Sequence, residues 1–463
     1  MNHNLEIDIS KVRKVHCIGI GGIGLSAVAE ILNNQGYEVT GSDPKSSIVT
    51  EHLESLGIKI YKEHSPSNVK GADLLVYSNA ISEDNPEMRE ASRLGIPKIT
   101  RAEMLGIIMK KYDHSIAICG THGKTTTTSM VSLIIRGAKL KPTILIGAEL
   151  EDIHGNVEIG SNEYFVTEAC EYMDSFLHLY PNIGVVLNID SDHLDYFKDV
   201  EHIVTSFKKF VSEIPDDGVV IAFSENPFMG DVIKAAKNVI TYGFNDDNDY
   251  SAKNVSFDDN GLARYDVYYK GIKQCHIDLN VPGEHNVLNS LAAFATCRYI
   301  GIEPEVISEI LHEFKGADRR FDFVGKMKCG AYVIDDYAHH PTEIKATISA
   351  TSNVKHKRSI CIFQPHTYTR TKALFDEFID AFEGLDLLVI TDIYAAREKD
   401  IYGVSSKQLV EKIRENHPDM TAYYIKDFDE IKDFIIDNAK RDDIVITMGA
   451  GDVYKISEML IDN

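Results

Sequence analysis

Two glycine-rich loops constrain the fold of this chain more than any other feature of its sequence. The first, G19-I-G-G-I-G24, ends an apolar run at 14–20 and precedes a segment at 25–34 with helical periodicity. The second, G120-T-H-G-K-T125, follows an apolar run at 114–119 and precedes another helix-like segment. A glycine turn between a buried strand and a helix is typical of parallel α/β sheets. We therefore expect an α/β protein with each loop at the carboxyl end of a strand.

Short apolar runs alternate with helix-like segments along the rest of the chain. Runs of four to six residues suit strands that are covered on both faces, and the alternation predicts doubly wound parallel sheets. Near 240–282 the pattern changes, and two strand-like pieces flank a predicted hairpin turn at 270–273. Further strands are expected at 38–40, 74–78, 163–167, 183–188, 263–269, 274–280, 331–335, 359–363, 387–391 and 443–447, and helices at 125–138 and 286–298.

The length and this alternation together predict three domains. The chain has 463 residues, enough for about three domains of roughly 150 residues each. We expect an N-terminal Rossmann-like domain over 1–110, a central P-loop ATPase-like domain over 111–315 and a C-terminal Rossmann-like domain over 316–463.

Charge and cysteine usage narrow the class of protein. The formal net charge of −23 disfavours a nucleic-acid partner, because phosphate contacts need concentrated Lys and Arg. Seven scattered cysteines without a C-x-x-C pair favour a reducing compartment over a disulfide framework. The acidic N-terminus lacks a signal-peptide core, and no apolar stretch is long enough to insert into a membrane. The sequence therefore predicts a cytoplasmic protein, either monomer or dimer.

The first loop has the spacing of a dinucleotide fingerprint. Gly19, Gly21 and Gly24 form G-x-G-x-x-G, and Asp43 follows at the distance expected for a residue that contacts a ribose. Such a loop binds a pyrophosphate at a helix N-terminus. A nicotinamide oxidoreductase is one interpretation, but it leaves the second loop without a function.

The second loop has the composition of a short phosphate-binding loop. Gly120 and Gly123 allow backbone N–H groups to converge on phosphate oxygens. Lys124 can reach the terminal phosphates, and the Thr125 hydroxyl can bind Mg²⁺. The pattern is shorter than G-x-x-x-x-G-K-[ST], because position 118 is Ile.

Two further strand ends supply candidate metal ligands. Glu168 directly follows the predicted strand at 163–167, and His193 lies just beyond the one at 183–188. Functional groups of open α/β sheets gather beyond the carboxyl ends of the strands. We therefore expect both side chains near the loop at 120–125.

Taken in order, the motifs of this chain resemble those of the Mur ligase family of ATP-dependent amino-acid ligases. The resemblance implies that the first domain binds the UDP part of a substrate, that the second binds ATP, and that the third closes over the site with an amino acid. The matching stretches are G19-I-G-G-I-G24, G120-T-H-G-K-T125, E168-A-C-E171, N188-I-D-S-D-H-L-D195, G283-E-H-N-V-L-N289, R319-R-F321, D335-D-Y-A-H-H340, F363-Q-P-H-T-Y-T-R370 and Y394-A-A-R-E-K399.

The resemblance also implies an activity. ATP would phosphorylate the lactyl carboxylate of UDP-N-acetylmuramate, and L-alanine would attack the acyl phosphate, in peptidoglycan precursor synthesis. ATP as a substrate and two Mg²⁺ ions are implied. The alternative within the family joins a recycled muropeptide, a tripeptide, to the same nucleotide sugar. A non-catalytic nucleotide-binding protein is disfavoured by the motifs of the third domain.

Family roles are carried over residue by residue, and the implied catalytic residues are Lys124, Glu168, His193 and His339. The metal ligands are Thr125, Glu168 and His193. The implied ATP contacts are Gly120, Thr121, His122, Gly123, Lys124, Thr125, Thr126, Asn286, Asn289, Arg320 and Asp336. The implied UDP-sugar contacts are Gly19, Gly21, Gly22, Ile23, Gly24, Asp43, Ser78 and Asn79. The amino-acid and sugar side comprises Tyr337, His339, His366 and Arg370.

Two points stay open at this stage. Thr367 stands where some relatives have arginine, which leaves Arg370 as the stronger candidate for an anion contact. The general base for the amine could be His339 or Asp336.

Overall fold

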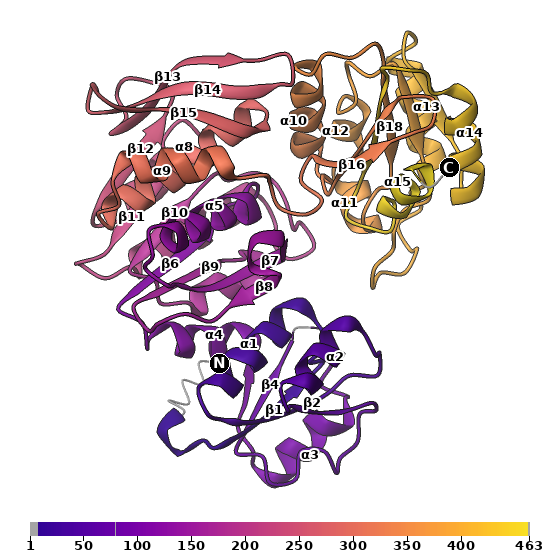
Figure 1. Cartoon of the computed structure of the whole chain (residues 1–463). Coiled ribbons are helices and arrows are strands. Elements are labelled where there is room, and N and C mark those ends of the chain that lie inside the picture. The colour runs from indigo at the N-terminus through magenta and orange to yellow at the C-terminus, as the bar shows by residue number, and fades with distance from the viewer. Residues whose placement is uncertain (1–7, 79, 462–463) are drawn as a thin grey trace. The chain divides into compact units, whose positions relative to one another are not determined.

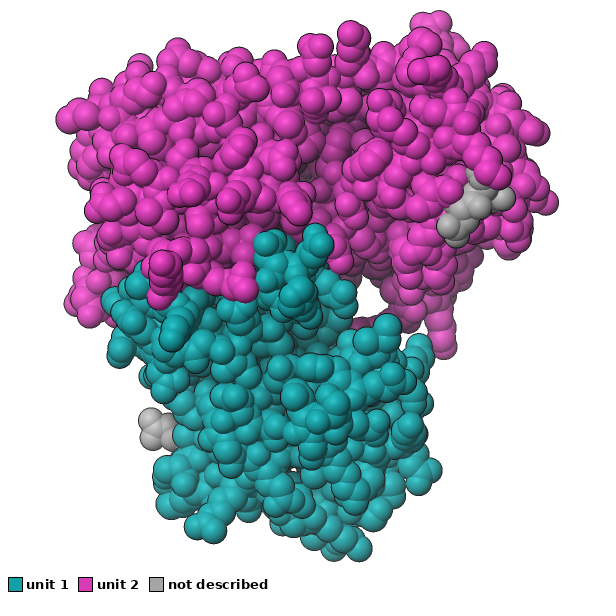
Figure 2. Space-filling view, in the orientation of Figure 1, with its two compact units in different colours: residues 1–117, 140–170, 174–182 teal, residues 118–139, 171–173, 183–463 magenta. Residues whose placement is uncertain are grey.

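The structure, a computed structural model, describes residues 8–78 and 80–461 (Figure 1). The predicted UDP-sugar contact Asn79 lies outside these residues. The chain forms two compact units (Figure 2). Unit 1 comprises 1–117, 140–170 and 174–182, and unit 2 comprises 118–139, 171–173 and 183–463. The predicted domain boundaries near 110 and 315 stay a prediction.

Unit 1 contains a five-stranded parallel sheet of order β3-β2-β1-β4-β5, as the first glycine loop predicts. Its central strand buries Val15, Cys17 and Ile18, and the first helix buries Leu25 and Val28 at helical spacing. The strands are β1 (Lys14–Ile18), β2 (Glu38–Ser42), β3 (Lys59–Tyr61), β4 (Leu74–Tyr77) and β5 (Lys98–Thr100), and the helices are η1 (Ile9–Lys11), α1 (Ile23–Asn34), α2 (Ile48–Ser55), α3 (Pro86–Leu94) and α4 (Arg101–Met109).

Unit 1 also holds three strands from the middle of the chain, in the order β9-β7-β8. β7 (Thr143–Leu150) pairs parallel with β9 (Tyr164–Glu168) and antiparallel with β8 (Gly155–Glu158). Two short 3-10 helices, η2 (Glu151–Ile153) and η3 (Tyr172–His178), lie nearby in the sequence. The strand β6 (His114–Cys119) begins in unit 1 and ends in unit 2.

The central part of unit 2 changes from parallel to antiparallel pairing along one run of strands. Pairing is parallel from β10 to β13 and antiparallel from β13 to β15. The predicted hairpin is confirmed, and its turn places Lys270 and Gly271 at positive φ. The strands are β10 (Ile183–Val186), β11 (Val219–Phe223), β12 (Val239–Gly243), β13 (Tyr250–Phe257), β14 (Leu262–Tyr269) and β15 (Ile272–Pro282), and the helices are α5 (Lys124–Gly137), α6 (Val200–Ser212), α7 (Met229–Ile233), α8 (Glu284–Tyr299) and α9 (Pro304–Glu313).

The C-terminal part of unit 2 is a six-stranded sheet of order β16-β17-β21-β18-β19-β20. Neighbouring residues of β18 enter different hydrophobic cores: Cys361 and Phe363 pack in one, and Ile360 and Ile362 in the other. This alternation confirms a sheet covered on both faces. The strands are β16 (Asp322–Lys326), β17 (Tyr332–Asp336), β18 (Ser359–Phe363), β19 (Leu387–Ile390), β20 (Thr421–Tyr424) and β21 (Ile444–Met448), and the helices are α10 (Pro341–Ser352), α11 (Tyr368–Ala373), α12 (Phe375–Ile379), α13 (Ser406–Asn416), α14 (Phe428–Asn438) and α15 (Tyr454–Ile461).

One edge of this sheet differs from the expected parallel pattern. β16 pairs antiparallel with β17, while the other pairs are parallel. Within the described residues, no helix has the length and apolar character needed to cross a membrane.

Candidate active site

The second glycine loop lies between β6 and α5, as predicted, and its glycines are required by geometry. Gly120 and Gly123 have φ of 140° and 84°. A Cβ atom at Gly120 would lie 2.9 Å from the Cβ of Leu187, and one at Gly123 would lie 2.5 Å from Oδ1 of Asn289. Gly123 is the N-cap of α5, so the first-turn N–H groups have no side-chain cap. These N–H groups suit an anion.

Lys124 is held by a carboxylate that follows β9. Its Nζ atom donates to Oε1 and Oε2 of Glu171 at 3.1 and 3.0 Å, and to the carbonyl oxygens of Gly120 and Thr121. Glu171 is buried, and its Oε1 lies 3.9 Å from Nε2 of His193. The Glu171 carboxylate therefore links the loop lysine to the predicted metal ligand His193.

His193 adopts a backbone conformation that is rare for a residue with a side chain. Its φ is 54°, in the left-handed region, and its N–H donates to Oδ1 of Asp192 at 2.7 Å. Its ring lies 4.7 Å from that of Tyr172, whose hydroxyl donates to Asp195. Strained backbone held by surrounding contacts is common at functional sites.

The other two predicted metal ligands lie in different units. Glu168 ends β9 in unit 1, where its Oε1 accepts the N–H of Gly147 at 2.7 Å. Thr125 lies buried in the first turn of α5 in unit 2. Their joint ligation of a metal ion stays a prediction.

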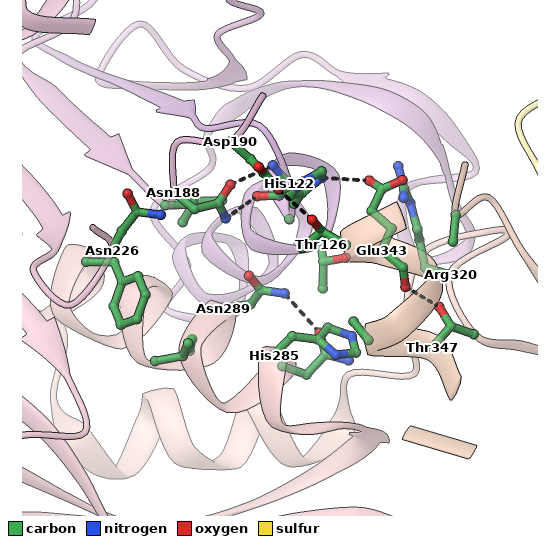
Figure 3. A pocket seen from close by; sticks show the side chains of 18 of the residues that line it. His122, Thr126, Asn188, Asp190, Asn226, His285, Asn289, Arg320, Glu343 and Thr347 are labelled. Atoms are coloured by element: carbon green, nitrogen blue, oxygen red, sulfur yellow. Dashed lines mark hydrogen bonds and ion pairs between the residues drawn. The ribbon is translucent and has the colours of Figure 1, made fainter. Parts of the chain in front are cut away.

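Unit 2 contains a cavity of about 410 Å³ beside the loop (Figure 3). Its lining includes the aromatic residues Phe223, Phe228 and Tyr242, called here the aromatic wall, which suit a planar heterocycle. It also includes charged residues, among them Asp190, Arg320 and Glu343. Seven predicted ATP contacts line the cavity: His122, Gly123, Thr126, Asn286, Asn289, Arg320 and Asp336. The remaining four, Gly120, Thr121, Lys124 and Thr125, are not among the described residues that line it.

Asn286 and Asn289 lie on the buried face of α8. Nδ2 of Asn289 donates to Oδ1 of Asn286 at 3.0 Å, and Nδ2 of Asn286 donates to the carbonyl of Pro282 at 2.7 Å. Both residues line the cavity. Their contact with an adenine stays a prediction.

The two adjacent arginines of R319-R-F321 have different surroundings. Arg319 donates to Oδ2 of Asp335 in β17 at 2.8 Å and to the carbonyl of Gly449, just after β21, at 2.7 Å. These bonds connect two neighbouring strands of the C-terminal sheet. Arg320 lines the cavity, with its guanidinium 5.0 Å from the centre of the Tyr337 ring. Only Arg320 is therefore placed to meet a nucleotide.

Asp336 is a buried carboxyl group beside the cavity. It accepts hydrogen bonds from the N–H groups of Phe321 and Ala338 and from the hydroxyl of Thr347. Burial raises the pKa of Asp336 to about 6, although the positive charge of Arg320 acts to lower it.

The residues predicted for the amino-acid and sugar side gather around Arg370. Its guanidinium donates from Nε and Nη2 to Oδ1 of Asp192 at 3.0 and 2.9 Å, and Nη1 lies 3.3 Å from Nδ1 of His366. The ring of His339 lies 5.7 Å from that of His366. Burial lowers the pKa of His339 to about 3 and that of His366 to about 4, so both imidazoles are neutral at pH 7.

Thr367, the position where some relatives have arginine, has a local structural role. Its side chain accepts the N–H of Arg370 at the start of α11, and its own φ is 67°. The residue thus caps the helix that presents Arg370.

The first glycine loop in unit 1 is built around Asp43. Gly19 has a φ of 77°, and Gly22 is the N-cap of α1, where Ile23 begins the helix. The N–H of Gly21 donates to Oδ2 of Asp43 at 3.0 Å, so this carboxylate supports the loop itself.

Two other residues lie close to this loop. A Cβ atom at Gly24 would lie 3.2 Å from the Arg101 guanidine group, a cation that the sequence analysis missed. Oγ of Ser78 lies 3.6 Å from the position of a Cβ at Gly19. A loop of N–H groups next to a cation suits a diphosphate.

Comparisons with known proteins agree with this architecture. Three family models match successive parts of the chain: "Mur ligase family, catalytic domain" over 14–113, "Mur ligase middle domain" over 118–297, and "Mur ligase, glutamate ligase domain" over 319–451. The chain belongs to the Mur ligase family. Its three-domain architecture and its membership of a family of ligases follow from these matches.

Individual relatives of this Mur ligase match over nearly their whole length. It is 50% identical to a UDP-N-acetylmuramate–L-alanine ligase from Caldanaerobacter subterraneus, covering 99% of each chain. It is also 50% identical to the ligase of that name from Alkaliphilus metalliredigens, covering 98% of each chain. A crystal structure of UDP-N-acetylmuramate–alanine ligase from Thermotoga maritima superposes with a TM-score of 0.80 at 29% identity, covering 97% of this chain and 98% of that one.

The predicted metal ligands include oxygen donors of the kind that suits the metal that Mur ligases typically need. Mur ligases are ATP-dependent and typically use Mg²⁺, a hard cation that prefers oxygen ligands. Thr125 in unit 2 has a hydroxyl oxygen, and Glu168 in unit 1 has a carboxylate oxygen. Within unit 2, the Glu171 carboxylate lies 3.9 Å from the His193 imidazole.

Sequence reasoning missed the aromatic wall of the cavity and part of its charged lining. Phe223, Asn226 and Phe228 lie at the end of β11 and just beyond it. They were missed because no strand was predicted at 219–223, so the carboxyl-end rule that located Glu168 and His193 was not applied there. Glu343, in the first turn of α10, was missed because nothing in the sequence places α10 beside the loop.

Proposed function

We propose that this Mur ligase joins L-alanine to the lactyl carboxylate of UDP-N-acetylmuramate and converts ATP to ADP and phosphate. The observation that carries the proposal is the 50% identity, over 99% of both chains, to a ligase with that printed name. Because the reaction uses ATP, we place the protein in the cytoplasm. We propose that it acts without a nucleic-acid partner, as a monomer or dimer.

The proposed chemistry overcomes the poor reactivity of a carboxylate. Transfer of the ATP γ-phosphoryl group to the lactyl carboxylate gives an acyl phosphate and ADP. The neutral amine of L-alanine then attacks the carbonyl carbon, phosphate leaves, and the amine gives up a proton. Because the first step brings anions together, cations in the site lower its barrier.

We assign the nucleotide to the cavity of unit 2. The phosphates would bind at the N–H groups of the first turn of α5 and at Lys124, whose Nζ donates a hydrogen bond to Glu171 in this structure. The adenine would occupy the aromatic wall near Asn286 and Asn289, and Arg320 would approach the phosphates from the C-terminal part.

We further propose two Mg²⁺ ions, one held by Thr125 and Glu168 and one by His193. Bound there, the metal would neutralise phosphate charge during transfer.

The remaining substrates are assigned to two clusters. The UDP diphosphate would bind at residues 19–24 next to Arg101, with Asp43 and Ser78 beside it. The alanine and the lactyl carboxylate would meet Tyr337, His339, His366 and Arg370. The proton acceptor for the amine is proposed to be His339 or Asp336; His339 is neutral at pH 7.

A phosphate-release assay tests this function. Purified protein, ATP, Mg²⁺ and UDP-N-acetylmuramate are combined with L-alanine, L-serine, glycine or the tripeptide L-Ala-γ-D-Glu-diaminopimelate. We expect L-alanine to give the highest kcat/KM, with the amide product identified by mass spectrometry. Turnover with the tripeptide alone would overturn the proposal.

A further inference from the structure

His122 lies between two carboxylates that come from distant parts of unit 2 (Figure 3). Its Nε2 is 3.1 Å from Oδ2 of Asp190, in the loop after β10, and its Nδ1 is 3.1 Å from Oε1 of Glu343, in the first turn of α10. A neutral imidazole donates from one nitrogen only, and a carboxylate only accepts. Two such contacts therefore require the doubly protonated, cationic ring.

The charges around the ring are consistent with this protonation state. Burial by itself would lower the pKa of His122, but the hydrogen bonds to Asp190 and Glu343 raise it to about 9. From α10 and its cap, the ring also faces His340, at 4.9 Å between centroids, whose pKa is lowered by burial and by His122. The positive charge of Arg320 also lowers the pKa of Glu343.

Glu343 also organises the segment that leads into α10. Its Oε2 accepts the N–H groups of His339 and His340 at 3.0 and 3.2 Å, so one carboxylate contacts both this segment and His122. Asp190 has a parallel role, because Oδ2 accepts the hydroxyl of Thr342 at 2.6 Å. His122 is thus connected to the start of α10 by two routes.

His122 has no ring N–H left to offer a phosphate. Its backbone is also engaged: its N–H donates to Oδ1 of Asn188 at 2.8 Å, and its carbonyl accepts Nδ2 of the same residue at 2.9 Å. These contacts argue for a structural link and not for the direct ATP contact that the sequence suggested.

We propose that His122 is a positioning residue of the ligase reaction, which as a cation ties the phosphate-binding loop to Glu343 at the start of α10. The proposal rests on the proposed function. We call the contacts of His122 with Asp190 and Glu343 the His122 bridge. This bridge holds the loop next to the segment that carries His339. It therefore serves the alignment of the bound reactants more than the binding of ATP itself.

A double-mutant cycle tests the bridge. His122→Gln and Glu343→Gln keep size but remove the ion pair, and each is expected to lower kcat by ~10–100-fold while the KM for ATP changes by less than ~3-fold. The double variant should be within ~3-fold of the slower single variant, because both substitutions break one link. His356→Gln, in the same part of the chain but away from the cavity, is the control and should match the wild type.

Two results would overturn the proposal. One is a double variant whose loss equals the product of the single losses. The other is a raised KM for ATP with unchanged kcat in His122→Gln, which indicates a phosphate contact. Thermal unfolding of each variant shows whether it is folded.

Nitrogen-15 NMR of histidine-labelled protein tests the bridge without substrates. The wild-type signals that are missing from the spectrum of His122→Gln belong to His122. These signals should show both ring nitrogens protonated at pH 7.5. In Glu343→Gln the loss of the His122 proton should occur at a lower pH. A neutral His122 ring at pH 7.5 overturns the bridge even if L-alanine is ligated. Conversely, a cationic His122 ring in a protein without L-alanine-dependent turnover would support the bridge and overturn the proposed function.

Discussion

At the scale of single residues, the cations of the site are held by carboxylates of the protein. Lys124 pairs with Glu171, Arg370 pairs with Asp192, and His122 lies between two acids. A buried cation without a partner is costly, so these acids stabilise the site. Substrate anions then have to compete with them for Lys124 and Arg370.

Replacing Lys124 tests the phosphate site. In Lys124→Ala the main cation of the loop is lost, so we expect kcat to fall by at least ~10²-fold in the phosphate-release assay. Circular dichroism should show the wild-type fold. Near-normal turnover would contradict the assignment of ATP to this loop.

Glu171→Gln tests whether this carboxylate positions Lys124 and His193. The variant removes the negative charge 3.0 Å from Lys124, so ATP should bind at least as tightly in calorimetry, while kcat falls by ~10-fold because Lys124 and His193 lose their shared partner. Glu201→Gln, on the exposed side of α6, is the matched control. Weakened ATP binding at unchanged kcat would count against this role.

At the scale of elements, the sequence predicted most of what carries the site. The strands that precede both glycine loops, the hairpin at 270–273 and the helix at 286–298 were predicted and are confirmed, because buried parallel strands leave apolar runs that can be recognised. β20 was missed because T421-A-Y-Y424 is a half-exposed edge strand without such a run.

The cavity was only partly predictable, because its walls come from elements far apart in the sequence. Motifs located His122, Asn289 and Arg320. The contact of Glu343 with His122, 221 residues away, depends on how α10 packs and leaves no local pattern. The roles of the predicted site residues stay predictions.

The junction of β6, the loop and α5 gives a test of backbone geometry. Gly123→Ala places a Cβ 2.5 Å from Asn289 at a positive φ, so we expect a loss of ~1–3 kcal/mol in the free energy of unfolding and weaker ATP binding. Gly230→Ala, at an exposed position of helix α7 with open space around it, should change stability by no more than ~1 kcal/mol. Urea unfolding compares the two, and equal stabilities would contradict the steric argument.

At the scale of the whole molecule, stability should depend on pH through the buried groups of unit 2. The pKa of His122 is raised to about 9, so its stabilisation is complete below its ordinary value near 6.5 and is lost as the pH rises through about 9. The pKa values of Asp190, Asp192 and Glu343 are lowered, so their stabilisation is present near neutrality and is lost in acid.

Thermal unfolding between pH 7 and pH 10 measures the alkaline limb. We expect the unfolding temperature assigned to unit 2 to fall more steeply in the wild type than in His122→Gln. The two compact units could unfold in separate transitions, and calorimetry resolves them. Identical slopes in the two proteins would rule out His122 as the group responsible.

The three consecutive residues 190–192 have a consequence for mutational tolerance. Asp190 and Asp192 use their side chains, toward Thr342 and Arg370. Ser191 contributes backbone atoms: its N–H donates to Oδ1 of Asp190 at 2.8 Å, and its carbonyl accepts Nε2 of His340 at 3.0 Å. A carbonyl is common to every amino acid. In a saturation library selected for growth, position 191 should accept many substitutions between two positions that accept almost none, while deletion of residue 191 should abolish function.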